Sequence, residues 1–145
     1  FGADLVVNSN NISAAIVDLS PVGKHLPDSL ASKIRSIKVP NFNDPGKLPE
    51  WGFIFSPYVC FIRPVDFLEE KSFLELIDQY LSLLLSLLVK VKRDEINSLD
   101  AMCRLNYQKR YCLNQKRNDK TRGILTKFFG SSWADEYINK ILFEC

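Results

Sequence analysis

Residues 1–20 read FGADLVVNSNNISAAIVDLS, two apolar runs of strand length on either side of a polar tetrapeptide. ADLVV at 3–7 and ISAAIVDL at 12–19 are rich in Val and Ile, and NSNN between them has the composition of a tight turn. We therefore predict an antiparallel hairpin. Because the first run begins at Phe1 without a preceding turn or cap, we expect further strands to precede it and the chain to be the C-terminal portion of a longer domain.

Two aspartates lie inside this hairpin. Asp4 interrupts an apolar strand, where an acid has poor β-propensity and is costly when it is buried without partners. Either it occupies an exposed position of the sheet or it serves a chemical purpose, and the pattern leaves both open. Asp18 precedes Ser20-Pro21 at the end of the second run, which is ordinary turn chemistry.

The stretch after the hairpin predicts a short helix, a loop and a strand. A helix is predicted over 28–38, with Asp28 or Ser29 as its cap. PNFNDPGKLPEWG at 40–52 has the composition of a turn-rich loop, and FIFSPYVCFIRP at 53–64 is apolar enough for a strand.

From Asp66 onward the apolar spacing changes to that of helices. A long helix with one buried face is predicted to run from Asp66 to residue 88. Asp94 or Asn97 is expected to cap a second helix that continues to Arg117.

A third helical segment is predicted to start near Thr121, to pause at Gly130 and to resume with Ser131 or Ser132 as its N-cap. Strands therefore come first along the chain and helices concentrate in its C-terminal half. That order predicts the α+β class, with an antiparallel sheet covered by helices in one domain over 1–145.

Composition argues against several classes of protein. A net charge of +2 does not indicate a nucleic-acid binder, and the four cysteines form no CxxC pair and no metal-ligand spacing with His25, the only histidine. LSLLLSLLV at 81–89 is too short to span a bilayer. We therefore expect no metal, no membrane and no nucleic acid.

One segment is strongly basic. Positions 104–122 hold seven Lys or Arg residues and a single acid, Asp119, which lies within NQKRNDKTR at 114–122. The charges fit a solvated helix face, a docking surface for an acidic partner, or a site for an anionic ligand. An acid inside so basic a stretch is explained cheaply by a helix tip, or chemically by a proton donor beside an anionic ligand.

Three strings carry a resemblance to a known family: FGADLVV with ISAAIVDLSP, LPEWGFIFSPYVCFIRP, and YCLNQKRNDKTRGILTKFFGSSWADEYINKILF. In order and spacing they resemble the ferredoxin-dependent bilin reductases, most closely the phycocyanobilin-forming branch. The resemblance covers essentially the whole chain, and only loosely at 23–46 and 90–106. It implies a three-layer α/β/α sandwich whose central antiparallel sheet and C-terminal helices enclose biliverdin.

The resemblance also implies roles for particular residues. Asp4 takes the position of the family's central aspartate at the pyrrole nitrogens, and Asp119 that of its loop aspartate. Ser13 matches a serine that binds a propionate. The flanking loop positions Asn118 and Lys120 are expected to bind substrate, although from sequence alone a helix-start turn is the preferred explanation. The expected arginine near 45–51 is absent, so Lys47 is expected to take its place.

The implied activity is that of an oxidoreductase acting on CH–CH groups. Reduced [2Fe-2S] ferredoxin would supply single electrons through bilin radicals, with no bound metal, flavin or nicotinamide. We expect acidic ferredoxin to dock on the cations Lys109, Arg110, Lys116 and Arg117. The expected product from biliverdin IXα is phycocyanobilin.

Other readings remain open at this point. The same chemistry could end in phycoerythrobilin, as in divergent or phage-type members, and a bilin carrier without turnover would need the pocket but neither acid. A monomer in a cyanobacterial or phage-infected cytoplasm, or in a plastid stroma, is expected.

Overall fold

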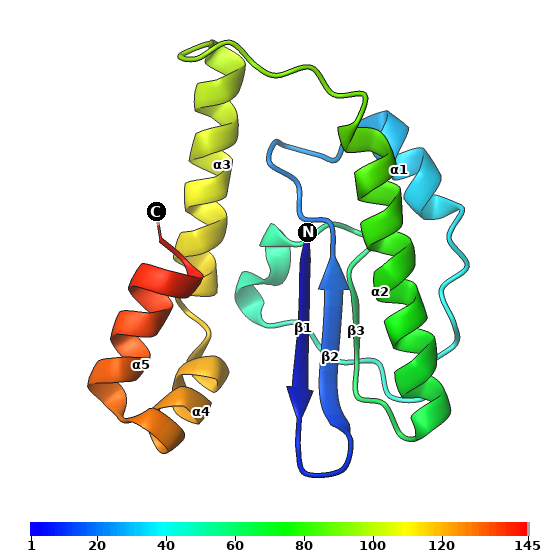
Figure 1. The fold of residues 1–145 in the computed structure, drawn as a ribbon, viewed down its shortest axis with the longest axis vertical. Coiled ribbons are helices and arrows are strands. Elements are labelled where there is room, and N and C mark those ends of the chain that lie inside the picture. The colour runs from blue at the N-terminus through cyan, green and yellow to red at the C-terminus, as the bar shows by residue number, and fades with distance from the viewer. Residues whose placement is uncertain (145) are drawn as a thin grey trace. The chain divides into compact units, whose positions relative to one another are not determined.

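The computed structural model describes residues 1–144, and these divide into two compact units, Phe1–Arg93 and a second that begins at Asp94. The first unit holds all the strands, and the second is helical (Figure 1). No helix in the described residues combines the length and apolar character needed to cross a membrane. Each unit is described by itself below.

The first unit is built on an antiparallel sheet in the order β1 (Gly2–Val7), β2 (Ile12–Asp18) and β3 (Cys60–Ile62). The predicted hairpin is confirmed: β1 pairs with β2, and the turn between them is held by Asn8, whose Oδ1 accepts from two backbone N–H groups of the turn. The pairing shifts between Val6 and Val7, which gives the hairpin a β-bulge.

The predicted strand over 53–64 is wrong in most of its length. The chain instead forms a 3-10 helix, η1 (Glu50–Ile54), and only β3 remains extended within the sheet. The backbone N–H of Ser56 donates to the side chain of Asp18 at 2.9 Å, and Pro57 has no N–H to offer. Neither residue can therefore donate a backbone N–H to a neighbouring strand, so the apolar run cannot pair continuously.

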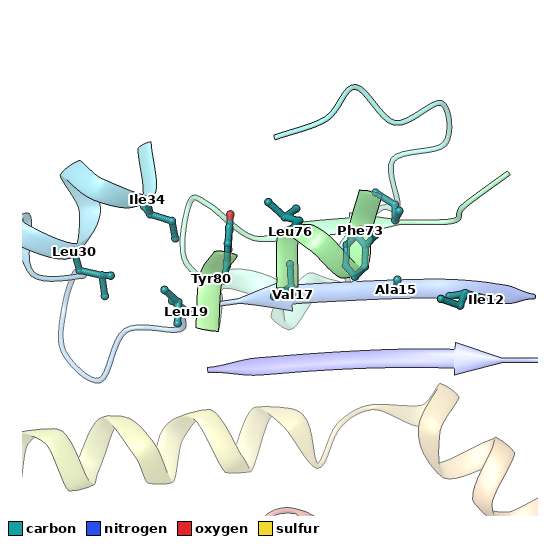
Figure 2. Close-up of a cluster of buried hydrophobic side chains, with 10 residues drawn as sticks. Ile12, Ala15, Val17, Leu19, Leu30, Ile34, Phe73, Leu76 and Tyr80 are labelled. Atoms are coloured by element: carbon teal, nitrogen blue, oxygen red, sulfur yellow. The ribbon is translucent and has the colours of Figure 1, made fainter. Parts of the chain in front are cut away.

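The core of the first unit lies between the sheet and two helices, α1 (Asp28–Arg35) and α2 (Phe67–Leu88). Side chains of α2 pack down onto β2, and α1 packs beside them (Figure 2). The buried cluster consists of Ile12, Ala15, Val17, Leu19, Leu30, Ile34, Ile62, Phe73, Leu76 and Tyr80. Burial of these apolar side chains is the main source of stability for this unit.

The starts of the two helices differ in how they are capped. Asp66 caps α2, since its Oδ1 accepts from the N–H of Glu69 at 2.8 Å. The prediction for α1 is wrong, because the cap position is Pro27 and no side chain caps the helix. Asp28 is instead the first helical residue, where an acid interacts favourably with the helix N-terminus.

The second unit contains α3 (Leu99–Gln115), α4 (Asp119–Phe129), α5 (Ser131–Tyr137) and a π-helical turn, η2 (Ile138–Leu142). Neither Asp94 nor Asn97 caps α3. Ser98 does so, because its Oγ accepts from the N–H of Ala101 at 3.2 Å, while Asp94 pairs with Arg104.

The break between α4 and α5 falls at Gly130, as predicted. Gly130 has a φ of 86°, a left-handed conformation that favours glycine, and it is both the end of α4 and the cap position of α5. The predicted serine caps are wrong, because Ser131 already lies inside the helix and no side chain caps it.

The α+β class is therefore confirmed, with a small antiparallel sheet followed by a helix-rich second half. The placement of the second unit as a covering layer, and the single domain over 1–145, stay predictions.

Candidate active site

Asp4 lies on the face of the sheet that is turned away from the core. In the register of the sheet Asp4 is opposite Ile16, and Ile16 is opposite Phe61, so these three residues form one row across the strands. The neighbouring residues of β2, Ala15 and Val17, point to the other face and are buried under α2. No helix of the first unit covers the row that contains Asp4.

The environment of Asp4 alters its acidity. Its side chain is exposed by surface area, yet the surrounding protein desolvates the carboxyl enough to raise its pKa above the ordinary value. An acid with a raised pKa on an apolar sheet face is suited to holding a proton and delivering it to a ligand.

The two other predicted residues of this unit lie at different places around the sheet. Ser13 is the unpaired residue of the bulge, and its Oγ donates to the carbonyl of Val6 at 3.0 Å. Lys47 is exposed and follows Gly46, whose N–H donates to the carbonyl of Phe61 at 2.7 Å. Ser13 therefore lies near the hairpin turn and Lys47 beside β3.

Asp18 has a larger structural part than its turn sequence predicts. It is buried, with only 2% of its surface exposed, and it accepts hydrogen bonds from Ser20 Oγ at 2.6 Å and from Ser56 N and Oγ at 2.9 and 2.5 Å. The bond from Ser20 is the predicted turn chemistry. The bonds from Ser56 tie the end of β2 to the segment before β3, and no sequence pattern indicated them.

In the second unit the NDKTR segment forms the start of α4. Asn118 is the N-cap, and its Oδ1 accepts from the N–H of Thr121 at 3.3 Å, which is the helix-start arrangement. Asp119 and Lys120 follow in the first turn with their side chains exposed. The cap uses only the amide oxygen of Asn118, so its NH₂ group can still donate to a ligand. The cap and the proposed binding role are therefore compatible.

Arg122 of the same segment was missed by the sequence analysis. It pairs with Asp135 of α5, and its Nη2 donates to the carbonyl of Lys116 at 3.3 Å. One guanidinium therefore joins the end of α3, the first turns of α4, and α5. Arg122 fixes the backbone around Asp119, and a helical i, i+3 position after an acid was the only signal that could have indicated it.

The cations expected to dock ferredoxin lie on the last two turns of α3 and just after them. Lys109 and the C-cap residue Lys116 are seven residues apart, so they share one side of the helix, and Arg117 follows beyond the helix end. The guanidinium of Arg110 lies 4.9 Å from the centre of the Tyr107 ring, which restricts its direction. The second unit thus presents a basic stripe next to the NDKTR turn.

The structure therefore gathers the predicted residues into two groups. Asp4, Ser13 and Lys47 belong to the sheet unit, and the remaining predicted residues belong to the helical unit. Within residues 1–144 no group of three or more His, Cys, Asp or Glu side chains is arranged to hold a metal ion.

The chain is similar to known proteins over nearly its whole length. Residues 1–144 match the sequence profile of the family described as ferredoxin-dependent bilin reductase. The chain is 49% identical over 144 residues to a phycocyanobilin:ferredoxin oxidoreductase of Prochlorococcus marinus strain MIT 9313, with 99% of this chain and 54% of that protein covered. It is 44% identical over 145 residues to the protein of the same name from Synechococcus sp. strain CC9605, covering 59% of it. The chain thus spans little more than half the length of these relatives.

The fold is also found among solved structures. A crystal structure of phytochromobilin synthase from tomato, in complex with biliverdin, matches 90% of this chain and 50% of its own with a TM-score of 0.61 and 20% identity. At that identity the match speaks for the fold alone. The profile match over residues 1–144 shows that the chain belongs to the ferredoxin-dependent bilin reductase family.

Proposed function

We propose that the protein containing this chain reduces biliverdin IXα to a phycobilin, with phycocyanobilin as the product, using electrons from reduced ferredoxin. Each double bond that is reduced takes up a pair of electrons and a pair of protons. Ferredoxin delivers the electrons singly, so the bilin passes through radical states and the protein supplies the protons. The reaction takes place where reduced ferredoxin is made, in a cyanobacterial cytoplasm or a plastid stroma.

The observation that carries this proposal is the position of Asp4 on the face of the sheet that no helix of the first unit covers, with its pKa raised by desolvation. A bilin that gains an electron becomes more basic, and a neutral carboxyl beside its pyrrole nitrogens is a suitable donor for the proton it then takes up. Contact with a flat, apolar pigment would desolvate this carboxyl further and favour the protonated form.

The helical unit supplies the second acid and the positive charge. We propose that Asp119 protonates a vinyl-bearing end ring, while Lys120 and the amide of Asn118 bind a propionate. Ser13 and Lys47 bind propionates from the sheet side. This division explains why an acid lies among the cations of NQKRNDKTR: the cations hold the anionic substituents, and the acid acts on the ring beside them.

The test is anaerobic turnover of biliverdin with reduced ferredoxin, followed by absorbance, in the parent protein and in Asp4→Asn and Asp119→Asn. Both variants keep the size of the side chain but remove its proton, so each should still bind biliverdin and accumulate a coloured, incompletely reduced species. The two species should differ, because the acids protonate different positions. Binding by the parent without turnover would instead identify a bilin carrier.

Ferredoxin docking gives a separate prediction. If acidic ferredoxin binds the basic stripe of α3, turnover at limiting ferredoxin should fall as the salt concentration rises from about 50 to 300 mM, because added ions screen the attraction. Lys109→Gln together with Arg110→Gln should reduce this salt dependence and leave biliverdin affinity unchanged. Turnover that is insensitive to salt would exclude the stripe as the docking surface.

A further inference from the structure

Phe61 is a large apolar residue of β3, the short strand at one edge of the three-stranded sheet, and its side chain lies outside the core. In β3 the side chains on either side of it, Cys60 and Ile62, point toward the core, and Ile62 is only 2% exposed. Phe61 points to the opposite face and belongs to the row Asp4–Ile16–Phe61. Its ring is half-buried and has no place in the buried cluster. It therefore lies on the same face of the sheet as Asp4.

The ring of Phe61 fills the space that a side chain at position 46 would occupy. The segment around Gly46 runs beside β3, with a bridge between Pro45 and Ile62 and a bond from Gly46 N to Phe61 O of 2.7 Å. A Cβ atom on Gly46 would lie 2.5 Å from Cδ1 and 2.6 Å from Cγ of the ring. Any side chain at position 46 would therefore force the ring of Phe61 to move. The ring can occupy its observed position only because residue 46 has no side chain.

Arg63 and Asp44 complete the surroundings of the ring. The guanidinium of Arg63 lies 5.8 Å from the centre of the Phe61 ring and 3.7 Å from a carboxylate oxygen of Asp44. The N–H of Arg63 also donates to the carbonyl of Asp44 at 2.9 Å. The ring is thus bordered by Gly46 and by a cation, while none of these contacts covers the side that continues the row toward Ile16 and Asp4.

We propose that the ring of Phe61 contacts the tetrapyrrole, and that Gly46 is a positioning residue which sets where the ring lies. This inference rests on the proposed function. Neighbouring strands are about 4.8 Å apart, so the row from Asp4 to Phe61 is about 10 Å long, a span suited to a flat substrate of several linked rings. An aromatic ring and a conjugated pigment attract each other in offset or edge-to-face contact.

The position of the Phe61 ring should also affect product specificity. Asp4 and Phe61 lie at the two ends of one row, so the ring limits how far the pigment can slide along the sheet relative to the acid. A ring displaced by a side chain at position 46 would shift the pigment relative to Asp4. Gly46→Ala should therefore alter the ratio of reduction products, and not only the affinity.

The experiment uses the full-length protein that contains this chain, with biliverdin as the probe. Phe61→Leu should weaken biliverdin binding by about 3- to 10-fold in absorbance titrations, the scale expected for the loss of one aromatic contact. Phe61→Tyr keeps the ring and should bind like the parent. Gly46→Ala should change the product ratio under ferredoxin-driven turnover. Phe53→Leu, at an exposed phenylalanine of η1, and Gly23→Ala, at a glycine where an added Cβ would make only an ordinary contact of 3.8 Å with the carbonyl of His25, are the matched controls.

A direct measurement does not depend on whether Phe61→Leu folds. In parent protein labelled with fluorophenylalanine, biliverdin should shift the ¹⁹F resonance of Phe61, assigned through Phe61→Tyr, and leave that of Phe53 in place. An unshifted Phe61 resonance, or unchanged affinity and products together with a lowered Tm in the folded variants, would overturn the inference and leave Phe61 and Gly46 a purely structural role. Failure of the parent to bind biliverdin would instead refute the proposed function itself.

Discussion

The two units hold their acids in place by different means. In the sheet unit Asp4 belongs to β1. The neighbouring strand, β2, packs into a buried cluster that includes Val17, Phe73 and Leu76, each fully buried. In the helical unit the buried apolar residues of the described chain are only Ala134 and Ile138. Asp119 is instead held by contacts close to it in sequence, namely the cap at Asn118 and the bonds of Arg122.

Because of this difference, the two aspartates should differ in which substitutions disturb their positions. The position of Asp4 depends on long-range packing, so core substitutions far from it should disturb it. The position of Asp119 depends on one turn of backbone, so substitutions within a few residues should matter most. Three predictions test this contrast.

The largest effect is expected in the core of the sheet unit. Phe73→Ala should lower the free energy of unfolding by about 3–5 kcal/mol, because it removes a fully buried ring and leaves a cavity. Phe128→Ala in α4 should change it by less than about 0.5 kcal/mol, because that ring is 71% exposed. Chemical denaturation of both variants measures the contrast. Equal losses would mean that the exposed rings of the helical unit are covered in the full-length protein.

A smaller effect is expected at the start of α4. Asn118→Ala should cost about 0.5–2 kcal/mol through loss of the cap, and Asn118→Ser should restore most of that stability because serine also caps helices. Serine lacks the amide NH₂ group, so it should not restore propionate binding. Thermal melts and biliverdin titrations on the two variants separate the roles. Full recovery of affinity in Asn118→Ser would confine Asn118 to capping.

The smallest effect is a pH dependence at Asp4. Its pKa is raised by desolvation in the folded protein, so the folded state binds a proton more readily than the unfolded state does. Ionised Asp4 therefore costs stability at pH values above its folded pKa, and that cost disappears as the pH falls below the pKa of the unfolded chain. Asp4→Asn should melt slightly higher than the parent near pH 7, and the difference should vanish on acidification.

Melting temperatures measured between about pH 4 and pH 7 check this prediction. Asp78→Asn, at an exposed acid of α2, is the control for a general effect of removing one charge. A difference between Asp4→Asn and the parent that grows toward low pH would contradict the raised pKa.

Much of the fold was predictable from local sequence. The hairpin, the long helix starting at Asp66 and the break at Gly130 follow from short-range signals: apolar spacing, a capping side chain and a residue that tolerates positive φ. The errors at the caps of α1, α3 and α5 are of two kinds. At α3 the cap is Ser98, next to the predicted Asn97, and at α1 and α5 no side chain caps the helix although candidate residues stand at both starts.

The candidate site was predictable only in part. Asp4 drew attention because an acid interrupts an apolar strand, and Asp119 because it is the single acid in a basic segment. The sequence could not indicate Arg122 or Phe61 as site residues, because an arginine in a basic stretch and a phenylalanine in an apolar one look ordinary. What sets them apart is their contacts in the folded protein: Arg122 binds Asp135 and the carbonyl of Lys116, and Phe61 lies against Gly46 and Arg63.

The sequence by itself determined the helices and strands that are set by residues close together in the chain, and through its motifs it determined the family. Tertiary structure alone decided which face of the sheet stays uncovered, because that depends on where α2 packs. It also decided that the run at 53–64 breaks, since Asp18 captures the N–H of Ser56 from 38 residues away. In the same way, Gly46 and Phe61 acquire their meaning only when two distant segments lie side by side. Contacts between residues far apart in the chain leave no periodic pattern in it, and that is the physical reason for the division.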